Sequence, residues 1–237
     1  MSRLALVLDD LAGRVLERLE DTQRRFTTAL DFGGRGAVAP ALIARGMAVT
    51  SADISAPMAA LAGGAPFLVT SENFGLEAQS FDLIVAHLSL HWINDLPGAL
   101  IQLRRALKPE GLFLASIPLL GTLGELRTAL LEAEEKITGG VSPRVSPFPD
   151  LRDCAGLLQR AGFALPVADA EEIAFLYANP LKLLLELRDA GENNAVLARS
   201  KKFAPRALFP AALTALPQHE GRVQATLRLG VLTGWAS

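Results

Sequence analysis

Glycine and acidic residues at a defined spacing are the first sign of chemistry in this chain. Gly33, Gly34 and Gly36 directly follow one apolar run, and Asp53 ends the next. Glycine lets the backbone take positive φ and approach a ligand closely. An acid at the end of the second strand lies where a ribose hydroxyl needs an acceptor. The spacing therefore predicts a binding site for a nucleotide-like cofactor.

The elements that must position these residues alternate between apolar runs and amphipathic stretches. An apolar run without alternation, such as 81–86, is typical of a parallel strand buried on both faces. Strands alternating with helices predict an α/β fold with a mostly parallel, seven-stranded sheet and helices on both faces. The expected strands are 29–33, 47–52, 66–70, 81–86 and 112–117, and the expected helices are 3–20, 37–45, 56–61 and 95–107.

After Pro118 the regular alternation stops. We expect helices over 123–137, 151–161, 180–190 and 205–216, a long strand over 163–177 and a final strand over 222–235. The predicted organisation is one domain with three parts, which are a cofactor-binding core at 1–118, a helical lid or substrate insertion at 119–190, and a C-terminal helix and strand at 191–237. Ligands of open α/β folds bind at the carboxyl ends of the strands, so the insertion is expected to select the substrate there.

Composition excludes several classes of protein. Half of the 237 residues are hydrophobic, 20% are charged and the formal net charge is −2. A large core and no nucleic-acid partner are expected. With a single cysteine, Cys154, and three histidines at unsuitable spacing, no metal site is predicted. We see no signal peptide and no apolar run long enough to span a bilayer, so a cytoplasmic protein is expected.

Several sequence blocks stand in the order and spacing of a known superfamily. They are LDFGGRG at 30–36, AD at 52–53, FDLIVAHLSLHWINDLPGAL at 81–100 and LKPEGLF at 107–113. Together they make the chain resemble the class I methyltransferases, which have a Rossmann-like fold and bind S-adenosylmethionine.

Two groups within that superfamily resemble this chain most. One is the malonyl-carrier-protein methyltransferase of biotin synthesis. The other, which is more similar, is the methyltransferase-like assembly factor of respiratory complex I that is described as an arginine hydroxylase. The blocks that resemble the second group are SLHWINDLP at 89–97, GTLGELR at 121–127, GGVSPRVSPF at 139–148 and LLQRAGF at 157–163.

The resemblance implies roles for residues of the glycine turn and the second strand. Gly33, Gly34 and Gly36 would wrap the amino-acid end of S-adenosylmethionine. Asp31 would hold that turn or accept a hydrogen bond from the cofactor's ammonium group. Asp53 would accept from both ribose hydroxyls, and Ile54 would pack against adenine.

The resemblance also implies contacts from the third and fourth strands. Thr70 stands where the family has an acid that contacts the adenine amine, so Glu72 would have to substitute for it. His87 and Leu88 would line the sulfonium side. The glycine turn itself is one residue shorter than is usual in the family.

Structural interpretations stand beside these functional ones. The glycines can form a tight strand–helix turn without a ligand, and Asp53 suits a helix cap as well as a ribose. His91 is a candidate catalytic residue, although a histidine in such a place is as often a hydrogen-bonded structural group. Arg144 is a candidate for binding an acidic substrate group or a solvated loop cation.

Three functions are compatible with the sequence. The first is a methyltransferase that uses S-adenosylmethionine to modify a small acid or a protein-borne group. The second is an assembly factor that modifies or only chaperones a subunit of respiratory complex I. The third is a methyltransferase fold whose cofactor site no longer works.

Overall fold

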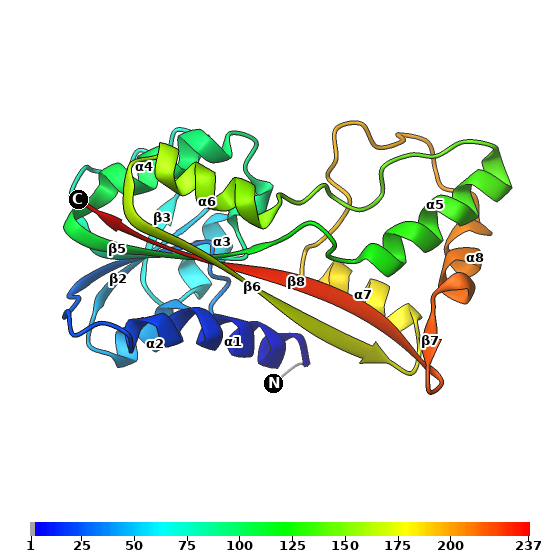
Figure 1. The fold of residues 1–237 in the computed structure, drawn as a ribbon, viewed down its shortest axis with the longest axis horizontal. Coiled ribbons are helices and arrows are strands. Elements are labelled where there is room, and N and C mark those ends of the chain that lie inside the picture. Colours follow the sequence, from blue (N-terminus) through cyan, green and yellow to red (C-terminus); the bar gives the residue numbers. More distant parts are fainter. Residues whose placement is uncertain (1–2) are drawn as a thin grey trace. The chain divides into compact units, whose positions relative to one another are not determined.

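The computed structural model describes residues 3–237, which form two compact units (Figure 1). Unit 1 comprises the residues up to Pro118 together with Pro149–Glu171 and Gly230–Ser237. Unit 2 comprises Leu119–Phe148 and Glu172–Leu229. All predicted cofactor residues belong to unit 1, whereas Arg144 belongs to unit 2.

A mostly parallel sheet forms the centre of unit 1. Its strand order is β3-β2-β1-β4-β5-β8-β6, and the neighbours from β3 to β5 are all parallel. Figure 1 shows β8 running opposite to β5. The predicted seven-stranded sheet is confirmed, and a short β7, which was not predicted, pairs with β8 as an eighth strand. The strands are β1 (Thr28–Phe32), β2 (Ala48–Asp53), β3 (Ala65–Leu68), β4 (Phe81–His87), β5 (Leu107–Pro118), β6 (Phe163–Tyr177), β7 (Gln218–His219) and β8 (Arg222–Ala236).

Helices cover both faces of this sheet, as predicted. Figure 1 shows α1 and α2 on one face of unit 1 and α4 and α6 on the other. The helix expected over 3–20 is α-helical only to Leu16 and ends in the 3-10 turn η1 (Glu17–Leu19), and a second 3-10 turn, η2 (Leu90–Trp92), follows β4. The helices of unit 1 are α1 (Arg3–Leu16), α2 (Ala39–Ala44), α3 (Ala56–Leu61), α4 (Leu96–Ala106) and α6 (Leu151–Arg160).

The central strands carry the core of unit 1. Leu83, Ile84 and Val85 of β4 are completely buried, as are Phe113 and Leu114 of β5. The prediction that the apolar run 81–86 is a strand covered on both faces is therefore confirmed.

β5 is longer than the strand predicted at 112–117. The segment Lys108–Gly111, which separates the predicted helix at 95–107 from this predicted strand, lies inside β5 as an irregularity. The register moves from Phe81 opposite Leu107 to Leu83 opposite Leu112, and Glu110 has a φ of +60°. The extra residues of β5 form a bulge, and the pairing of β5 with β4 resumes at Leu112.

Unit 2 has a hydrophobic core of its own around α5 (Gly124–Thr138), α7 (Leu181–Asp189) and α8 (Leu208–Ala215). Buried residues from all three helices and from β6 and β8 form one cluster, which includes Leu130, Tyr177, Leu183, Leu208 and Val223. Tyr177 of this cluster also makes a polar contact, because its hydroxyl donates to Glu186 Oε2 at 2.8 Å. Three of the four helices that were predicted after Pro118 therefore pack against one another, whereas the fourth, α6, belongs to unit 1.

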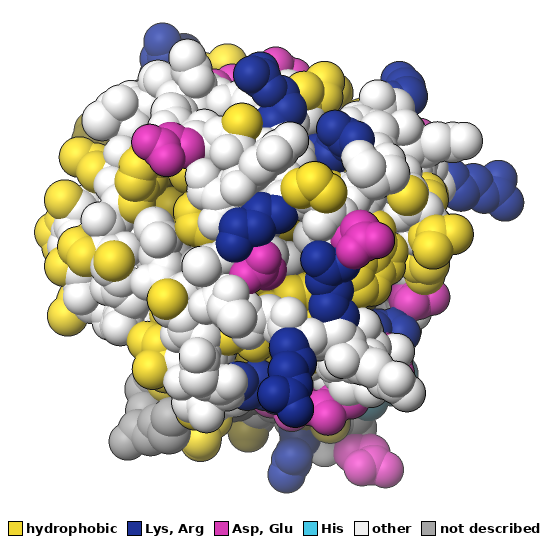
Figure 2. All heavy atoms as spheres, turned by 90° about the vertical axis from the view of Figure 1, so that its left-hand side faces the viewer, with side chains coloured by type: hydrophobic (Ala, Val, Ile, Leu, Met, Phe, Trp, Pro, Cys, Tyr) yellow, Lys and Arg dark blue, Asp and Glu magenta, His cyan; other side chains and the backbone are white. Residues whose placement is uncertain are grey.

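The surface of unit 1 mixes apolar and charged side chains. Figure 2 shows hydrophobic groups gathered towards one side of the face it presents, with arginine, lysine and acidic side chains beside them. No helix among residues 3–237 has the length and apolar character needed to cross a bilayer.

Asp82 ties together the beginnings of three neighbouring strands. Its Oδ2 accepts hydrogen bonds from the Thr27 amide at 3.1 Å and from the Thr28 amide at 3.0 Å, and its Oδ1 lies 3.1 Å from Lys108 Nζ. Burial alone would raise the pKa of Asp82, but the donors from Thr27, Thr28 and Lys108 together hold the pKa well below its usual range. The ionised carboxylate is thus the form that the fold stabilises.

Replacing Asp82 by Asn is expected to lower the free energy of unfolding by about 2 kcal/mol, because hydrogen bonds to a charged group contribute about that much. Urea denaturation at neutral pH measures this loss. Glu77→Gln, at an exposed position in the preceding loop, is the control and should leave stability unchanged. Equal stability of the two variants would contradict the anchoring role of Asp82.

Candidate functional site

The pairing of β1 with its two neighbours brings most of the predicted cofactor residues together. Phe32 at the end of β1 lies opposite Ala52, and the Gly33 amide donates to the Ala52 carbonyl at 2.8 Å. On the other side, Asp31 lies opposite Val85 of β4. The glycine turn, Asp53 and the end of β4 therefore meet at the carboxyl edge of the sheet. Open α/β folds bind ligands at this edge.

The glycine turn is required by its conformation and by its neighbours. Gly33 and Gly36 have φ values of +72° and +84°. A Cβ on Gly33 would lie 2.6 Å from the Cβ of Ser89, and a Cβ on Gly34 would lie 2.1 Å from Asp31 Oδ1. A Cβ on Gly36 would meet nothing within 4 Å. Packing thus explains Gly33 and Gly34 without a ligand, whereas Gly36 borders open space.

Asp31 holds the glycine turn from below. Its carboxyl group is almost completely buried, and Oδ2 accepts from the Ala39 amide at the beginning of α2 at 3.1 Å. Oδ1 lies against Gly34 without a hydrogen bond of ordinary geometry. Burial raises the pKa of Asp31 to about 7, and the amides of Ala39 and Gly34 only partly oppose this. Of its two expected roles, holding the turn is the one that these contacts support.

Asp53 presents a carboxylate oxygen beside an exposed apolar side chain. Its Oδ1 accepts from the Ser55 amide at 2.8 Å. The N-cap of α3 is Ser55, so Asp53 does not form the helix cap that the structural interpretation suggested. Its Oδ2 has no hydrogen-bond partner among the described residues. The neighbouring side chain of Ile54 is 79% exposed. An acceptor and an apolar surface are therefore adjacent, as a ribose and its base require.

His87 is held by β5 and is completely buried. Its Nδ1 lies 2.8 Å from Ser116 Oγ, and the same hydroxyl accepts from the Leu88 amide at 3.2 Å. Burial, and then the charge of Arg35, lower the pKa of His87 to about 4, although the backbone of Leu8 acts in the opposite direction. The imidazole is therefore neutral near pH 7. Its Nε2 makes no hydrogen bond to the described residues.

The backbone after β4 is strained and tied to the end of β1. Leu88 has a φ of +47°, which is unusual for a residue with a branched side chain. Ser89 Oγ donates to the Phe32 carbonyl at 2.6 Å, and Arg35 reaches the Leu88 carbonyl at 3.4 Å. Sequence reasoning missed Arg35, Ser89 and Ser116, because single polar residues near strand ends carry no periodic signal and only the register shows what they face.

Thr70 and Glu72 lie apart from the strand end where an acid was expected. Thr70 follows the end of β3 by two residues and is exposed. Glu72 accepts from the amide and the side-chain nitrogen of Asn94 at 3.0 and 2.7 Å. These hydrogen bonds lower the pKa of Glu72. The carboxylate of Glu72 thus holds the turn that precedes α4, which gives it a structural role.

The two catalytic candidates have structural partners. His91 lies in η2, and its ring centroid is 5.1 Å from that of Trp92. Arg144 forms a paired contact with Glu134, with Nη2 2.6 Å from Oε1 and Nε 3.1 Å from Oε2. Their side chains are only 15% and 8% exposed. Glu134 of α5 is buried, because the loop carrying Arg144 folds over it.

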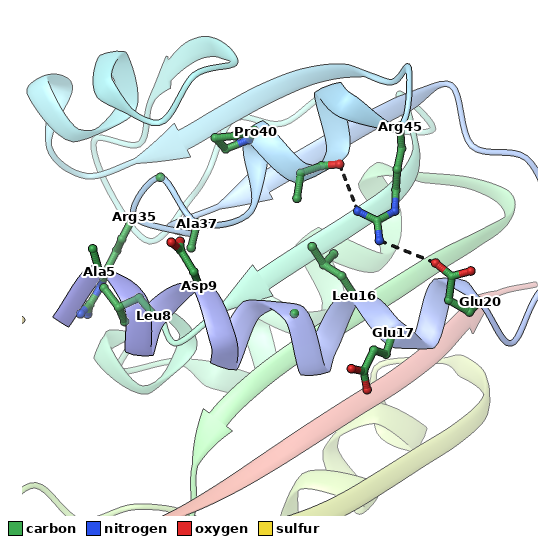
Figure 3. Close-up of a pocket in the computed structure, with 13 residues that line it drawn as sticks. Ala5, Leu8, Asp9, Leu16, Glu17, Glu20, Arg35, Ala37, Pro40 and Arg45 are labelled. Carbon is green, nitrogen blue, oxygen red and sulfur yellow. Dashed lines mark hydrogen bonds and ion pairs between the residues drawn. The ribbon is translucent and has the colours of Figure 1, made fainter. Parts of the chain in front are cut away.

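A pocket of about 730 Å³ lies between α1 and α2 (Figure 3). Leu8 and Leu16 of α1 form part of its wall, and Arg35 and Gly36 of the glycine turn form another part. Arg45 bridges the two sides, because its guanidinium donates to the Ala41 carbonyl at 3.1 Å and lies 3.7 Å from Glu20. Gly36 is the one predicted cofactor residue on this wall, so the pocket is next to the strand-end site and distinct from most of it.

Taken together, the strand order and the groups at the ends of β1, β2 and β4 define a methyltransferase fold of the Rossmann-like class. Residues 7–166 match the family model described as a methyltransferase domain, and the chain belongs to that family.

Curated relatives include proteins with two different names. The chain is 35% identical to human "Arginine-hydroxylase NDUFAF5, mitochondrial" over 96% of this chain and 69% of that protein. It is 42% identical to the protein of the same name from Dictyostelium discoideum, but the alignment spans only 38% of that protein. It is also 30% identical to a malonyl-[acyl-carrier protein] O-methyltransferase of Gallionella capsiferriformans, over 98% of this chain and 84% of that enzyme.

Solved structures share the fold at low sequence identity. The YcgJ protein of Bacillus subtilis superposes with a TM-score of 0.63 and 14% identity, covering 95% of this chain and 97% of that protein. A phosphoethanolamine N-methyltransferase of Haemonchus contortus, solved with S-adenosyl-L-methionine, has a TM-score of 0.56 and 18% identity, covering 95% of this chain and 52% of that enzyme. Similarity at these identities shows the fold alone.

The buried groups Asp31 and His87 predict opposing effects of pH on stability. The pKa of Asp31 is raised from 3.8 to about 7, so its contribution to stability is lost as pH rises between these values. The pKa of His87 is lowered from 6.5 to about 4, so its contribution is lost as pH falls through that window. In the wild type the two slopes should largely cancel.

Single substitutions should reveal each slope by urea denaturation across this pH range. The stability of Asp31→Asn is expected to rise with pH because His87 remains, whereas the stability of His87→Gln is expected to fall with pH because Asp31 remains. The double variant is the control and should resemble the wild type in its pH dependence. Parallel profiles of the two single variants would contradict the assigned pKa shifts.

Arg144→Ala is expected to lower the free energy of unfolding by about 3 kcal/mol, because it leaves the buried carboxylate of Glu134 without its partner. Chemical denaturation measures the loss. Arg152→Ala, at an exposed arginine of α6, is the matched control and should cost little. If Arg144→Ala were as stable as this control, the pair would not be structural.

Proposed function

We propose that unit 1 binds S-adenosylmethionine at the ends of β1, β2 and β4, and that the chain transfers its methyl group to a small acid or a protein-borne acceptor. The observation that carries this proposal is Asp53, which offers Oδ2 as an acceptor beside the exposed side chain of Ile54 at the carboxyl edge of a family member's sheet. Gly36, with open space above it, supports a close approach of the cofactor to the turn.

Bound S-adenosylmethionine would supply an electrophilic methyl group on a sulfonium. The residues of this chain would bind and position it, since much of the rate of such a transfer comes from orientation and exclusion of water. Asp53 would accept from the ribose hydroxyls, and Ile54 would cover the adenine. Leu88 would shield the sulfonium side. The neutral state of His87 avoids placing a second cation beside a cationic sulfonium.

A second candidate is an assembly factor that modifies an arginine of a respiratory complex I subunit. The match to the arginine hydroxylases, 35% identity over 96% of this chain, favours it. A third candidate is a fold without cofactor binding, because packing is a sufficient reason for Gly33 and Gly34. A cytoplasmic location stays a prediction, since the named hydroxylases are mitochondrial proteins.

S-adenosylmethionine is expected to raise the melting temperature of the chain in a concentration-dependent way. At a ligand concentration one hundred times the dissociation constant, the gain in stability is about 2.7 kcal/mol. Asp53→Ala should abolish the shift because it removes the ribose acceptor. Asp153→Ala, at an exposed position in α6, is the control and should keep the shift. The absence of any shift at millimolar cofactor would contradict the proposal and favour the third candidate.

Mass spectrometry of a modified acceptor separates the first two candidates. Incubation with S-adenosylmethionine and a malonyl-carrier protein should add the mass of a methylene group if the chain is a methyltransferase on that acceptor. Incubation with complex I subunits that adds the mass of one oxygen to an arginine peptide would instead establish the hydroxylase. Pull-down of a complex I subunit without any mass change would identify an assembly role alone.

A further inference from the structure

An acid-free segment of unit 2 concentrates positive charge. Between Glu192 and Glu220 the sequence contains no aspartate or glutamate, although the chain as a whole has a formal net charge of −2. The segment contains four cations, which are Arg199, Lys201, Lys202 and Arg206. All four are exposed, and none of them forms an ion pair with an acid of the described residues. This part of unit 2 therefore carries an unneutralised positive charge.

Apolar side chains project from the same segment. Phe203 is 103% exposed, which is as much as in an isolated extended peptide, and Leu197 is 88% exposed. Phe209, at the beginning of α8, is 40% exposed. Burying a phenylalanine side chain stabilises a protein, so a chain that leaves one fully exposed among cations forgoes that stabilisation. Exposed apolar side chains beside cations are a combination suited to an interaction surface.

Contacts with the rest of unit 2 hold both ends of this segment. Asn194 donates to the Pro143 carbonyl at 2.9 Å, and its side-chain oxygen accepts from the Val196 amide at 3.2 Å. At the other end Leu208 is completely buried in the core of unit 2. The cations and the two exposed apolar side chains lie between these anchors.

We propose that residues 197–206, which we call the basic loop, dock unit 2 on the surface of an anionic lipid bilayer. The cations would lie at the headgroup phosphates, and Phe203 and Leu197 would enter the interface between headgroups and acyl chains. Cationic side chains with protruding aromatic and aliphatic ones are the combination that binds peripherally to anionic membranes. This inference goes beyond the proposed function and does not depend on a working cofactor site.

The observations favour a bilayer over other polyanions. A single-stranded nucleic acid would be held by a groove with several aromatic platforms, whereas Phe203 is the one aromatic side chain of the basic loop and its companion, Leu197, is aliphatic. Because Phe203 protrudes fully, its apolar surface suits insertion into an interface more than contact with a flat acidic protein surface.

Vesicle co-sedimentation of the full chain tests this proposal. Vesicles of phosphatidylcholine alone are compared with vesicles of an equimolar phosphatidylcholine–phosphatidylglycerol mixture. Binding is expected only to the anionic vesicles and should weaken as salt is added. Lys201→Ala/Lys202→Ala should weaken binding about 30-fold, from about 1 kcal/mol for each lysine near the surface. Phe203→Ser should weaken binding about tenfold through the loss of apolar burial.

The matched control is Lys136→Ala/Lys182→Ala, which removes the same charge from exposed positions of α5 and α7. It should bind as the wild type does, and melting curves establish that all variants are folded. Equal binding to neutral and anionic vesicles would overturn the proposal, as would equal loss in the control. Binding to duplex DNA or polyglutamate without binding to vesicles would assign the basic loop to a different partner and overturn it as well.

Discussion

The parallel pairing of β1 with β2 and β4 is the constraint on which the candidate site depends. Because Phe32 lies opposite Ala52 and Asp31 lies opposite Val85, three strands end at one level. Residues that are far apart in sequence, from the glycine turn to His87, thereby meet at one edge. Each further contact, such as that of Ser89 with the Phe32 carbonyl, reinforces this arrangement. A shift of one residue in either pairing would turn these side chains to the other face of the sheet.

Burial at that edge sets the charges of the site. Asp31 and His87 lie on neighbouring strands, and both are held away from water, so the pKa of the acid rises and the pKa of the base falls. The groups under the site therefore carry less charge than their types suggest. Asp53, which is only half-buried, keeps an oxygen that accepts no hydrogen bond from the described residues. The contrast between buried groups of reduced charge and a partly exposed carboxylate is what makes Asp53 the stronger candidate for contact with a polar ligand.

Unit 2 uses charge in two different ways. Arg144 and Glu134 of unit 2 neutralise one another in a paired contact. If either side chain bound a substrate instead, the other would be left as a buried charge without a partner. In the basic loop, four cations form no ion pair with an acid among residues 3–237. The same residue types therefore hold the fold in one place and remain available for a partner in the other.

The fold could be predicted from the sequence to a large extent. The uninterrupted apolar run at 81–86, the glycines after 29–33 and the alternation of elements were sufficient for a mostly parallel sheet with helices on both faces, because periodicity and turn residues are local properties of the chain. Family motifs at 30–36 and 81–100 indicated the methyltransferase family. Errors arose where pairing extended an element, as at the bulge inside β5, or where two residues formed β7 by pairing with β8 alone.

What the sequence could not determine was the partner of each polar side chain. The sequence made Glu72 a candidate for an adenine contact, and in the structure its carboxylate accepts hydrogen bonds from Asn94. The sequence made Arg144 a candidate for a substrate contact, and in the structure its guanidinium pairs with Glu134. Likewise, only the tertiary structure decided that Ser116 of β5 lies opposite His87 of the neighbouring strand β4. The sequence by itself determined which elements form and the family to which they belong, because those depend on local patterns. The tertiary structure decided which charges are buried, paired or exposed, because these depend on contacts between residues that are distant along the chain.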